Sequence, residues 1–372
     1  MPRILGRDLS RRDLLRRTGR LEQFAGVTAG AYADGPECGV RYLDLRSGGG
    51  IELRVLIDRA FDIGELRADG ISLGWRSANG FRAPGLHRAE EDEGAGLLRS
   101  LDGFLVTCGL DHVRGAAEGS AAHFGTRRTR VRYPLHGRIH ATPARLVGYG
   151  ERWDGEDCVL WCEGETRQTM LYGETLVLRR RIEVPLGGTG LSIRDRVENA
   201  GFRPTPHMIL YHVNLGWPLL DEGTALALDG AFARADLRGA IGGAPAAADT
   251  TAGDELFEAG PGPGEAACAV INEGLAGGLA VELTFDTATL PNMQIWRNLS
   301  EGIYVLAVEP ANHPAAPRAD LDRDGRVRHL APGETVEHRL RLTVHRGPPA
   351  IAALRARLAA PAGDGAAPPR EG

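Results

Sequence analysis

Lysine is absent from this chain of 372 residues, and all 44 basic side chains are arginines. The same sequence is rich in glycine, with 51 residues, and in proline, with 22. This combination is typical of a genome-wide compositional bias, so one arginine alone does not indicate an anion ligand. The formal net charge is only −5. So small a charge gives no indication of a nucleic acid or another polyanion as partner.

Cysteines and long apolar runs are also scarce. Only Cys158 and Cys162 of the five cysteines are close in sequence, and an extended strand would spread them apart. Neither a disulfide framework nor a zinc motif is recognisable, which is typical of a reducing cytoplasm. No run of about 18 apolar residues occurs, so no membrane span is expected. The segment SRRDLL at 10–15 lacks a following apolar region, and we therefore do not interpret it as an export signal.

Helical periodicity is nearly absent, whereas strand patterns recur along the chain. Alternating apolar and polar residues are separated by turn signals such as Asp69–Gly70 and GGTG at 187–190. The expected strands lie within 39–75, 174–201, 269–286, 293–298, 302–310 and 334–345. The sequence contains no repeat of fixed period, so a propeller fold is disfavoured. We predict a mostly β protein built as one large antiparallel β-sandwich.

Three segments are predicted along the chain. Residues 1–35 form a lead-in with a short helix within 9–19, and residues 36–348 form a single sandwich domain that carries the site. Residues 349–372 form a C-terminal tail that we expect to be disordered, most clearly over 360–372. Within the domain, 83–97 is expected as a loop with a helical turn. The stretch 240–267 is expected as a long surface loop.

The segment MILYHVNLGWPLL at 208–220 reads as a buried strand that carries polar residues. Strand alternation places Ile209 and Tyr211 on an ordinary core face and His212 and Asn214 on the other. Gly216 follows directly, which indicates the end of the strand. A satisfied core histidine is the plain interpretation, and a site at the strand end is the functional one.

The segment LHGRIHATPA at 135–144 also collects polar side chains. If it is extended, His136, Arg138 and His140 share one face, and Gly137 permits close approach of backbone or ligand. Four residues of strand separate the two histidines by roughly 13 Å. That distance is too long for both to bind one ion unless the chain bends. A solvated edge strand is the alternative.

Two later strands complete the set. In NMQIWRN, Gln294 and Trp296 share a face, and an aromatic ring flanked by amides is typical of a sugar site, although a wet outer face has the same pattern. In VLAVEPANHP, Glu309 ends an apolar strand face just before Pro310. Partial desolvation raises the pKa of such a carboxyl and suits it to act as a base. A structural salt bridge to an arginine is the alternative.

Together these segments resemble the aldose 1-epimerase (galactose mutarotase-like) superfamily over about residues 40–345. YHVNLG at 211–216 is similar to the family's strand that bears the catalytic acid, which implies that role for His212 and substrate binding for Asn214. The Glu-Pro segment implies Glu309 as the catalytic base. The spacing from His212 to Asn214 is shorter than in the common form of the family.

The same resemblance implies further substrate ligands. LHGR at 135–138 is similar to the family's His-Gly motif, which implies that His136 binds the sugar near its ring oxygen, with Arg138 beside it. DRAFDIG at 58–64 occupies the place of an early arginine segment, which implies Arg59 as a ligand. Gln294 and Trp296 are expected in the same sugar site. No counterpart of the family's substrate-binding aspartate is recognisable.

The implied reaction is the interconversion of sugar anomers by acid–base ring opening, without a cofactor. One alternative keeps the scaffold but uses a divalent metal, held by His136, His212 and Glu309, to isomerise, epimerise or cleave a keto-sugar or sugar acid. Another is a carbohydrate-binding protein without catalysis. The expected partner is a small sugar or sugar derivative. The sequence leaves open the sugar, the oligomeric state and whether Arg59, Arg114 and Arg138 face hydroxyls, a carboxylate or a phosphate. It also leaves open the roles of Asp111, His112, His140, His207 and His313.

Overall fold

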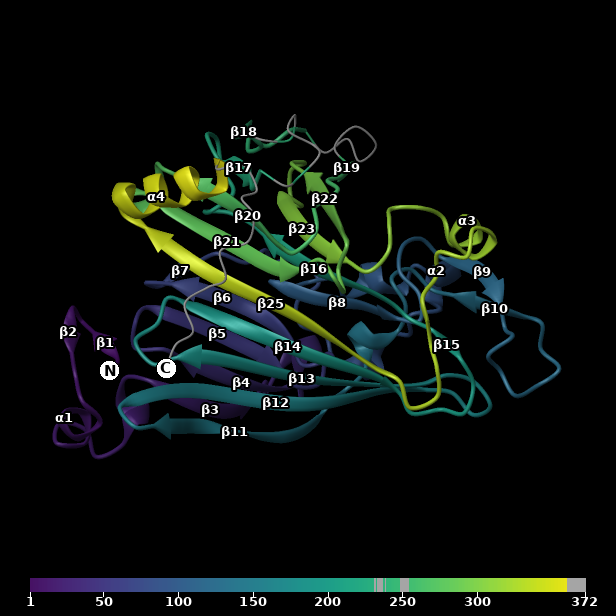
Figure 1. Cartoon of the computed structure of the whole chain (residues 1–372), viewed down its shortest axis with the longest axis horizontal. Helices are drawn as coiled ribbons and strands as arrows, with labels where there is room; N and C mark the ends of the chain where they lie inside the picture. The colour runs from purple at the N-terminus through teal and green to yellow at the C-terminus, as the bar shows by residue number, and fades with distance from the viewer. Residues whose placement is uncertain (231, 233–236, 238, 248–253, 360–372) are drawn as a thin grey trace.

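Strands dominate the computed structural model, which describes residues 1–230, 232, 237, 239–247 and 254–359 (Figure 1). The largest sheet is antiparallel, with nine strands in the order β11-β12-β13-β14-β25-β21-β20-β17-β18. In that order its strands are β11 (Arg145–Asp154), β12 (Asp157–Thr169), β13 (Thr175–Pro185), β14 (Gly190–Asn199), β25 (Thr335–Arg346), β21 (Leu279–Asp286), β20 (Glu265–Asn272), β17 (Ala225–Leu228) and β18 (Gly239–Ala240).

Two five-stranded antiparallel sheets form the opposite layer, behind the nine-stranded sheet in Figure 1. The first contains β19 (Asp254–Glu258), β22 (Asn292–Asn298), β23 (Val305–Ala311), β16 (Met208–Leu215) and β8 (Leu105–Leu110). The second contains β3 (Gly26–Ala31), β4 (Arg41–Arg46), β5 (Ile51–Leu56), β6 (Asp62–Ala68) and β7 (Ile71–Ser72). Backbone hydrogen bonds from Trp75 to Asn214 and from Phe104 to Gly64 join the two sheets.

Short elements fill the edges of the sandwich. Three two-stranded pairs are β1 (Arg3–Ile4) with β2 (Arg7–Asp8), β9 (Ala117–Ser120) with β10 (Arg130–Tyr133), and β15 (Thr205–Pro206) with β24 (His329–Leu330). The α-helices are α1 (Arg11–Leu15), α2 (Glu91–Gly94), α3 (Arg318–Arg323) and α4 (Gly347–Ala359). The 3-10 helices include η1 (Leu21–Gln23), η2 (Gly35–Glu37), η3 (Pro84–Leu86), η4 (Gly96–Arg99), η5 (Ile139–Ala141) and η7 (Leu275–Gly277). Within the described ranges, no helix has both the length and the apolarity needed to cross a membrane.

One apolar core lies between the two layers. It takes Ile63 from β6, Ile193 from β14 and Ile209 from β16, all of them fully buried. The alternation expected along 208–215 is confirmed, because Ile209 and Tyr211 enter this core. The predicted hairpin at Asp69–Gly70 is also confirmed, with both residues at positive φ between β6 and β7. The large antiparallel sandwich predicted from the strand pattern is therefore the observed fold.

A buried ion network ties the layers together beside the site strand. Arg180 of β13 contacts Asp62 of β6 and Asp195 of β14, each at 2.6 Å. The hydroxyl of Tyr211 on β16 donates to Asp195 at 2.8 Å. Breaking one partner of such a buried network leaves an uncompensated charge and is strongly destabilising. The network therefore fixes the position of β16 relative to both layers.

Two loop expectations are wrong. Residues 349–359, expected in a disordered tail, belong to α4, because Ile351, Leu354 and Leu358 lie at helical spacing and pack on the sheet. The stretch 240–267, expected as a surface loop, contains β19, which pairs with β22 and so completes that sheet edge. The rest of both expectations, 248–253 and 360–372, lies outside the described residues. The short helix within 9–19 and the helical turn within 83–97 are confirmed.

Candidate functional site

Three polar side chains form a row across adjacent strands β22, β23 and β16. The register pairs Gln294 with Glu309, and Val213 with Val308, which places His212 beside Glu309. All three side chains are nearly inaccessible to solvent. Directly opposite residues on one face of an antiparallel sheet have neighbouring side chains. Strand pairing therefore brings together two segments about one hundred residues apart in the sequence.

His212 is held from both sides of its ring. Its Nε2 lies 3.0 Å from Oε1 of Glu309, an ion-pair contact in which Oε1 lacks a well-aligned hydrogen bond. On the other side, Nδ1 lies 2.5 Å from Oδ1 of Asn214. The amide of Asn214 is itself oriented, because its Nδ2 donates to the Gly103 carbonyl at 2.9 Å. Asn214 therefore accepts the Nδ1 proton, and Nε2 is the atom that faces the site.

The electrostatics of His212 combine opposing effects. Burial by itself lowers the pKa of the imidazole. The Glu309 carboxylate, together with hydrogen bonding to Glu309 and Asn214, outweighs burial and raises the pKa above its ordinary 6.5. Arg114 opposes this rise as a nearby positive charge. The arrangement favours a protonated imidazole beside a carboxylate.

His212 and Glu309 line a pocket of about 320 Å³, near the lower end of the roughly 300–1,000 Å³ that ligand sites occupy. The other polar residues of its wall are Arg114 and His136. The remaining lining residues are Leu97, Leu98, Leu101, Gly115, Leu135, Leu256 and Trp296. A few convergent polar groups in an otherwise apolar wall are typical of a small-molecule site.

Aromatic rings support the pocket wall. Trp296 meets the His212 ring edge to face, with centroids 5.5 Å apart. Trp75 packs against Trp296 at 6.4 Å, and its Nε1 donates to the Ile303 carbonyl at 2.5 Å. Pairs of this geometry contribute about 0.5–1.5 kcal/mol beyond the area they bury. The expected position of Trp296 on the site face of β22 is therefore observed.

The segment 135–144 is not the extended strand that the sequence suggested. His136 and Gly137 have φ of 57° and 74°, and a 3-10 turn follows at Ile139–Ala141. The bend arises because Gly137 lies against the β8 end, where an added Cβ would be 2.2 Å from the Gly109 carbonyl oxygen. The predicted close approach of backbone at Gly137 is thereby confirmed. The predicted common face of His136, Arg138 and His140 is wrong.

The bend sends these three side chains in different directions. The ring of His136 reaches the pocket, 5.8 Å between centroids from His212, and burial holds its pKa well below 6.5. Arg138 instead donates to Glu90 at 2.6 Å. His140 is fully buried, with neither ring nitrogen hydrogen bonded, and burial lowers its pKa to about 3. Neither Arg138 nor His140 lines the pocket.

Three other predicted ligands also lie outside the pocket wall. Arg59 is buried, and its Nη2 donates to the Ser100 carbonyl. Gln294 lies behind the wall, where its Oε1 accepts from Arg114 at 3.0 Å. Asn214 supports His212 from beneath. Gln294 thus orients Arg114, and Asn214 orients His212. Arg59 does not reach the pocket.

The sequence left the contact of Arg114 open and gave no indication of Leu256 in the pocket. Arg114 lies in the loop after β8 at φ 79°, where no alternation marks it, although Gly115 beside it was a turn signal. Leu256 comes from β19, which was expected as loop, although Leu256 and Phe257 were apolar residues in an otherwise polar stretch. Both reach the pocket through tertiary contacts that local pattern does not encode.

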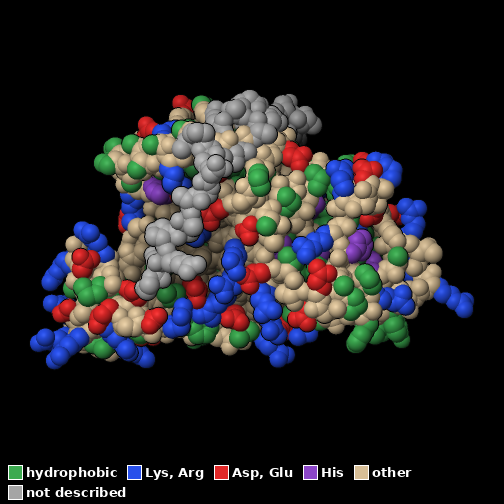
Figure 2. Space-filling model, in the orientation of Figure 1, with side chains coloured by type: hydrophobic (Ala, Val, Ile, Leu, Met, Phe, Trp, Pro, Cys, Tyr) green, Lys and Arg blue, Asp and Glu red, His purple; other side chains and the backbone are tan. Residues whose placement is uncertain are grey.

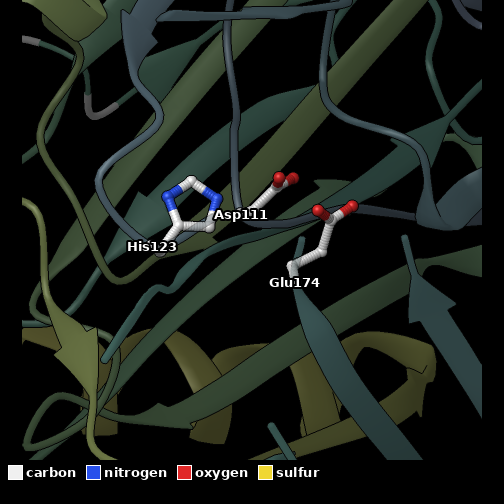
Figure 3. A group of neighbouring side chains, drawn as sticks. All are labelled: Asp111, His123 and Glu174. Atoms are coloured by element: carbon white, nitrogen blue, oxygen red, sulfur yellow. The ribbon is translucent and has the colours of Figure 1, made fainter. Parts of the chain in front are cut away.

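The three residues of the alternative metal site do not lie close enough together to share one ion. Within the described residues, His136, His212 and Glu309 do not bring one ligand atom each within 4.8 Å of one another. A different group does, namely Asp111, His123 and Glu174 (Figure 3). These three residues do not line the pocket. The His212 pocket thus contains an adjacent histidine and carboxylate rather than a compact ligand cluster.

A second cavity lacks comparable chemistry. A cavity of about 400 Å³ over β3–β6 contains charged side chains that already pair with one another, such as Arg54 with Asp44 at 2.7 Å. On the face in Figure 2, acidic and basic side chains are interspersed rather than segregated. We therefore take the His212 pocket as the functional site.

Solved structures of other proteins share this fold. A proposed aldose 1-epimerase from Klebsiella pneumoniae superposes with a TM-score of 0.78 at 21% identity, covering 91% of each chain. A galactose mutarotase-like protein from Clostridium acetobutylicum gives 0.58 at 12% identity, over 87% of this chain and 99% of that one. A galactose 1-epimerase from Lactobacillus acidophilus gives 0.50 at 14%, over 87% and 99%.

These identities are low, so the likeness shows the fold. No curated protein matches the sequence. The model of one family, described as a domain of unknown function (DUF4432), matches residues 37–344. That match spans most of the chain and includes every strand that lines the pocket. The chain belongs to the DUF4432 family and has the galactose mutarotase-like sandwich fold.

Proposed function

We propose that this protein interconverts the α and β anomers of an aldose or aldose derivative by acid–base ring opening. The observation that carries the proposal is the contact of His212 Nε2 with Glu309 Oε1 at 3.0 Å on the wall of the pocket. The reaction needs one acid and one base that act on two oxygens of the same carbon. An adjacent histidine and carboxylate on neighbouring strands meet that need.

Each step follows from the positions of these groups. The Glu309 carboxylate takes the proton of the C1 hydroxyl, while Nε2–H of His212 protonates the ring oxygen. The bond from C1 to the ring oxygen breaks, and C1 and its hydroxyl oxygen become an aldehyde. Rotation about C1–C2 presents the other carbonyl face. The ring recloses with proton transfers reversed, which returns both groups to their starting states.

The surrounding residues have supporting roles in this proposal. Asn214 fixes the tautomer of His212, so that Nε2 carries the transferred proton. His136, kept neutral by burial, offers a hydrogen bond to a sugar oxygen from the pocket wall beside His212. Arg114 presents a positive charge, oriented by Gln294. The apolar ring of Trp296, which Trp75 packs against, offers a surface for the C–H face of a sugar ring.

The test is exchange NMR or polarimetry of freshly dissolved single anomers. A panel of neutral, acidic and phosphorylated aldoses is compared with and without EDTA. We expect faster anomer exchange for at least one class of sugar, unaffected by EDTA. His212→Gln and Glu309→Gln should each lower the rate by about 10²–10⁴-fold.

A second histidine–carboxylate pair provides the matched control. His345 Nε2 lies 2.8 Å from Glu282 Oε2, and neither residue lines the pocket. His345→Gln should therefore keep the wild-type rate. The proposal fails if no sugar is accelerated, or if His345→Gln loses as much activity as His212→Gln. Sugar binding without acceleration would instead indicate a carbohydrate-binding protein, and loss with EDTA a metal-assisted reaction.

A further inference from the structure

Three buried side chains from distant segments converge beside the end of β8. Asp111 directly follows β8, His123 lies in the loop between β9 and β10, and Glu174 lies just before β13. One ligand atom from each residue lies within 4.8 Å of the other two. Figure 3 shows the imidazole edge of His123 turned towards the two carboxyl groups. The side chains are 1%, 5% and 3% exposed, respectively.

One member of this cluster has an unused donor atom. Nε2 of His123 is fully buried and has no hydrogen-bond partner. A buried polar atom without a partner costs about 1–3 kcal/mol, and a ligand bound at Nε2 would remove that cost. Burial also lowers the pKa of His123 to about 4, so the imidazole is neutral near pH 7. Neutral imidazole is the form that binds metal ions.

The charges around the cluster leave a deficit of positive charge. Arg138 is the nearest cation, 3.9 Å from Asp111 Oδ2, but it also pairs with Glu90 at 2.6 Å. Arg318 donates to the Asp111 carbonyl and pairs with Asp322 at 2.9 Å. Both arginines are thus matched by other carboxylates. The carboxyl groups of Asp111 and Glu174 are left close together in a buried space.

A neighbouring amide holds the carboxyl groups in place. Gln168 donates from Nε2 to Asp111 Oδ1 at 2.7 Å and is 3.5 Å from Glu174 Oε1. Its own Oε1 accepts from the Leu110 backbone at 2.8 Å, which fixes the direction of the amide. Metal-binding carboxylates are commonly oriented by hydrogen bonds of this kind.

We propose that Asp111, His123 and Glu174 bind one divalent transition-metal ion, such as Zn²⁺. One nitrogen and two carboxylate donors suit this class of ion, and two carboxylates neutralise its charge. Mg²⁺ and Ca²⁺ prefer sites made entirely of oxygen donors. The site is separate from the His212 pocket and does not depend on the proposed sugar chemistry.

The ion would anchor the loop that leads into the pocket. Three residues after Asp111, Arg114 lines the pocket, and its carbonyl accepts from the His136 backbone at 2.9 Å. Asp111 therefore begins the segment that positions two pocket residues. The ion has a structural role here, because it cross-links β8, the β9–β10 loop and the start of β13. Its loss should lower the thermal stability, whereas the contact of His212 with Glu309, held by the paired strands β16 and β23, should persist.

The test is calorimetric titration of Zn²⁺ into full-length protein that was dialysed against EDTA and then freed of chelator. Elemental analysis then gives the number of ions retained per chain. We expect one ion per chain and a rise in the thermal midpoint. His123→Ala and the near-isosteric Glu174→Gln should each weaken binding by roughly 100-fold or more. Circular dichroism checks that both variants fold.

The matched control removes a histidine elsewhere. His345 pairs with Glu282 outside the cluster, so His345→Ala should bind one ion with unchanged affinity. The proposal is overturned if wild-type protein retains no ion at a Zn²⁺ concentration tenfold above that of the protein. It is equally overturned if folded His123→Ala or Glu174→Gln binds as wild type does. Because the readouts are stoichiometry and stability, failure of sugar turnover does not affect the result.

Discussion

Nε2 of His212 and Oε1 of Glu309 lie 3.0 Å apart, on neighbouring antiparallel strands of one sheet. Both groups are buried, and electrostatic interactions between buried groups are strong. The carboxylate raises the pKa of the imidazole despite burial. The proposed ring opening would start from a protonated His212 beside the Glu309 carboxylate. A bound sugar would replace this direct contact with one hydrogen bond to each group.

Glu309→Gln should lower the pKa of His212, because the substitution removes the main group that raises it. Burial and the positive charge of Arg114 then remain and favour the neutral imidazole. Titration of the His212 ring by NMR in the two proteins measures the shift. The prediction fails if His212 titrates at the same pH in both. His345→Gln is the control, because it removes a different histidine and should not move the His212 signal.

Asn214→Ala should lower turnover by about tenfold while substrate affinity changes little. Asn214 does not line the pocket, but it accepts the Nδ1 proton of His212 and so fixes the tautomer. Loss of that acceptor also lowers the pKa of His212, since the hydrogen bond helps to raise it. Steady-state kinetics across pH separates the two effects. A merely structural role would lower stability and leave the pH profile unmoved.

The strand pattern was sufficient for the fold and for much of the site, for a physical reason. His212, Glu309 and Trp296 lie on strands, where alternation ties side-chain direction to sequence position. Antiparallel pairing then aligned them without any special local geometry. The sugar chemistry came from the resemblance, and the structure places His212 beside Glu309.

Residues outside regular strands could not be placed in the same way. His136 reaches the pocket through a bend at positive φ, which depends on backbone packing between Gly137 and Gly109. Arg114 depends on the same loop. The sequence did not predict β19, because polar and small residues surround it. Its residues become a strand only by pairing with β22. Propensity is a weak guide where tertiary pairing decides.

Gly137→Ala should destabilise the fold far more than Gly70→Ala. Both glycines have positive φ, 74° and 81°, so the backbone cost of alanine is similar. An added Cβ at Gly137 would lie 2.2 Å from a backbone oxygen, whereas at Gly70 it would meet nothing within 4 Å. Urea unfolding of the two variants isolates the steric term. We expect a difference of about 2 kcal/mol or more, and equal destabilisation would contradict the close packing.

The protein should lose stability steeply as the pH falls from 7 to 5. Burial lowers the pKa of His112 and His313 to about 4, and that of His140 and His338 to about 3. In the unfolded chain a histidine titrates near 6.5, so below that pH the unfolded state binds protons that the folded state does not. Each such residue lowers the free energy of unfolding by about 0.7 kcal/mol per pH unit at pH 6.5, and by about 1.4 kcal/mol per pH unit near pH 5.

His212 acts in the opposite direction. Its folded pKa is raised, so its contribution to stability is full below 6.5 and is lost as the pH rises through its folded pKa. The contribution of His212 to the pH dependence of stability is smaller than the combined contribution of the four buried neutral histidines. Urea unfolding between pH 7 and 5, with EDTA present, measures the slope. His140→Met removes one titrating group whose ring nitrogens have no partners, and should reduce the slope near pH 5 by about 1.4 kcal/mol per pH unit. A stability that stays level down to pH 5 would contradict the neutral burial of these histidines.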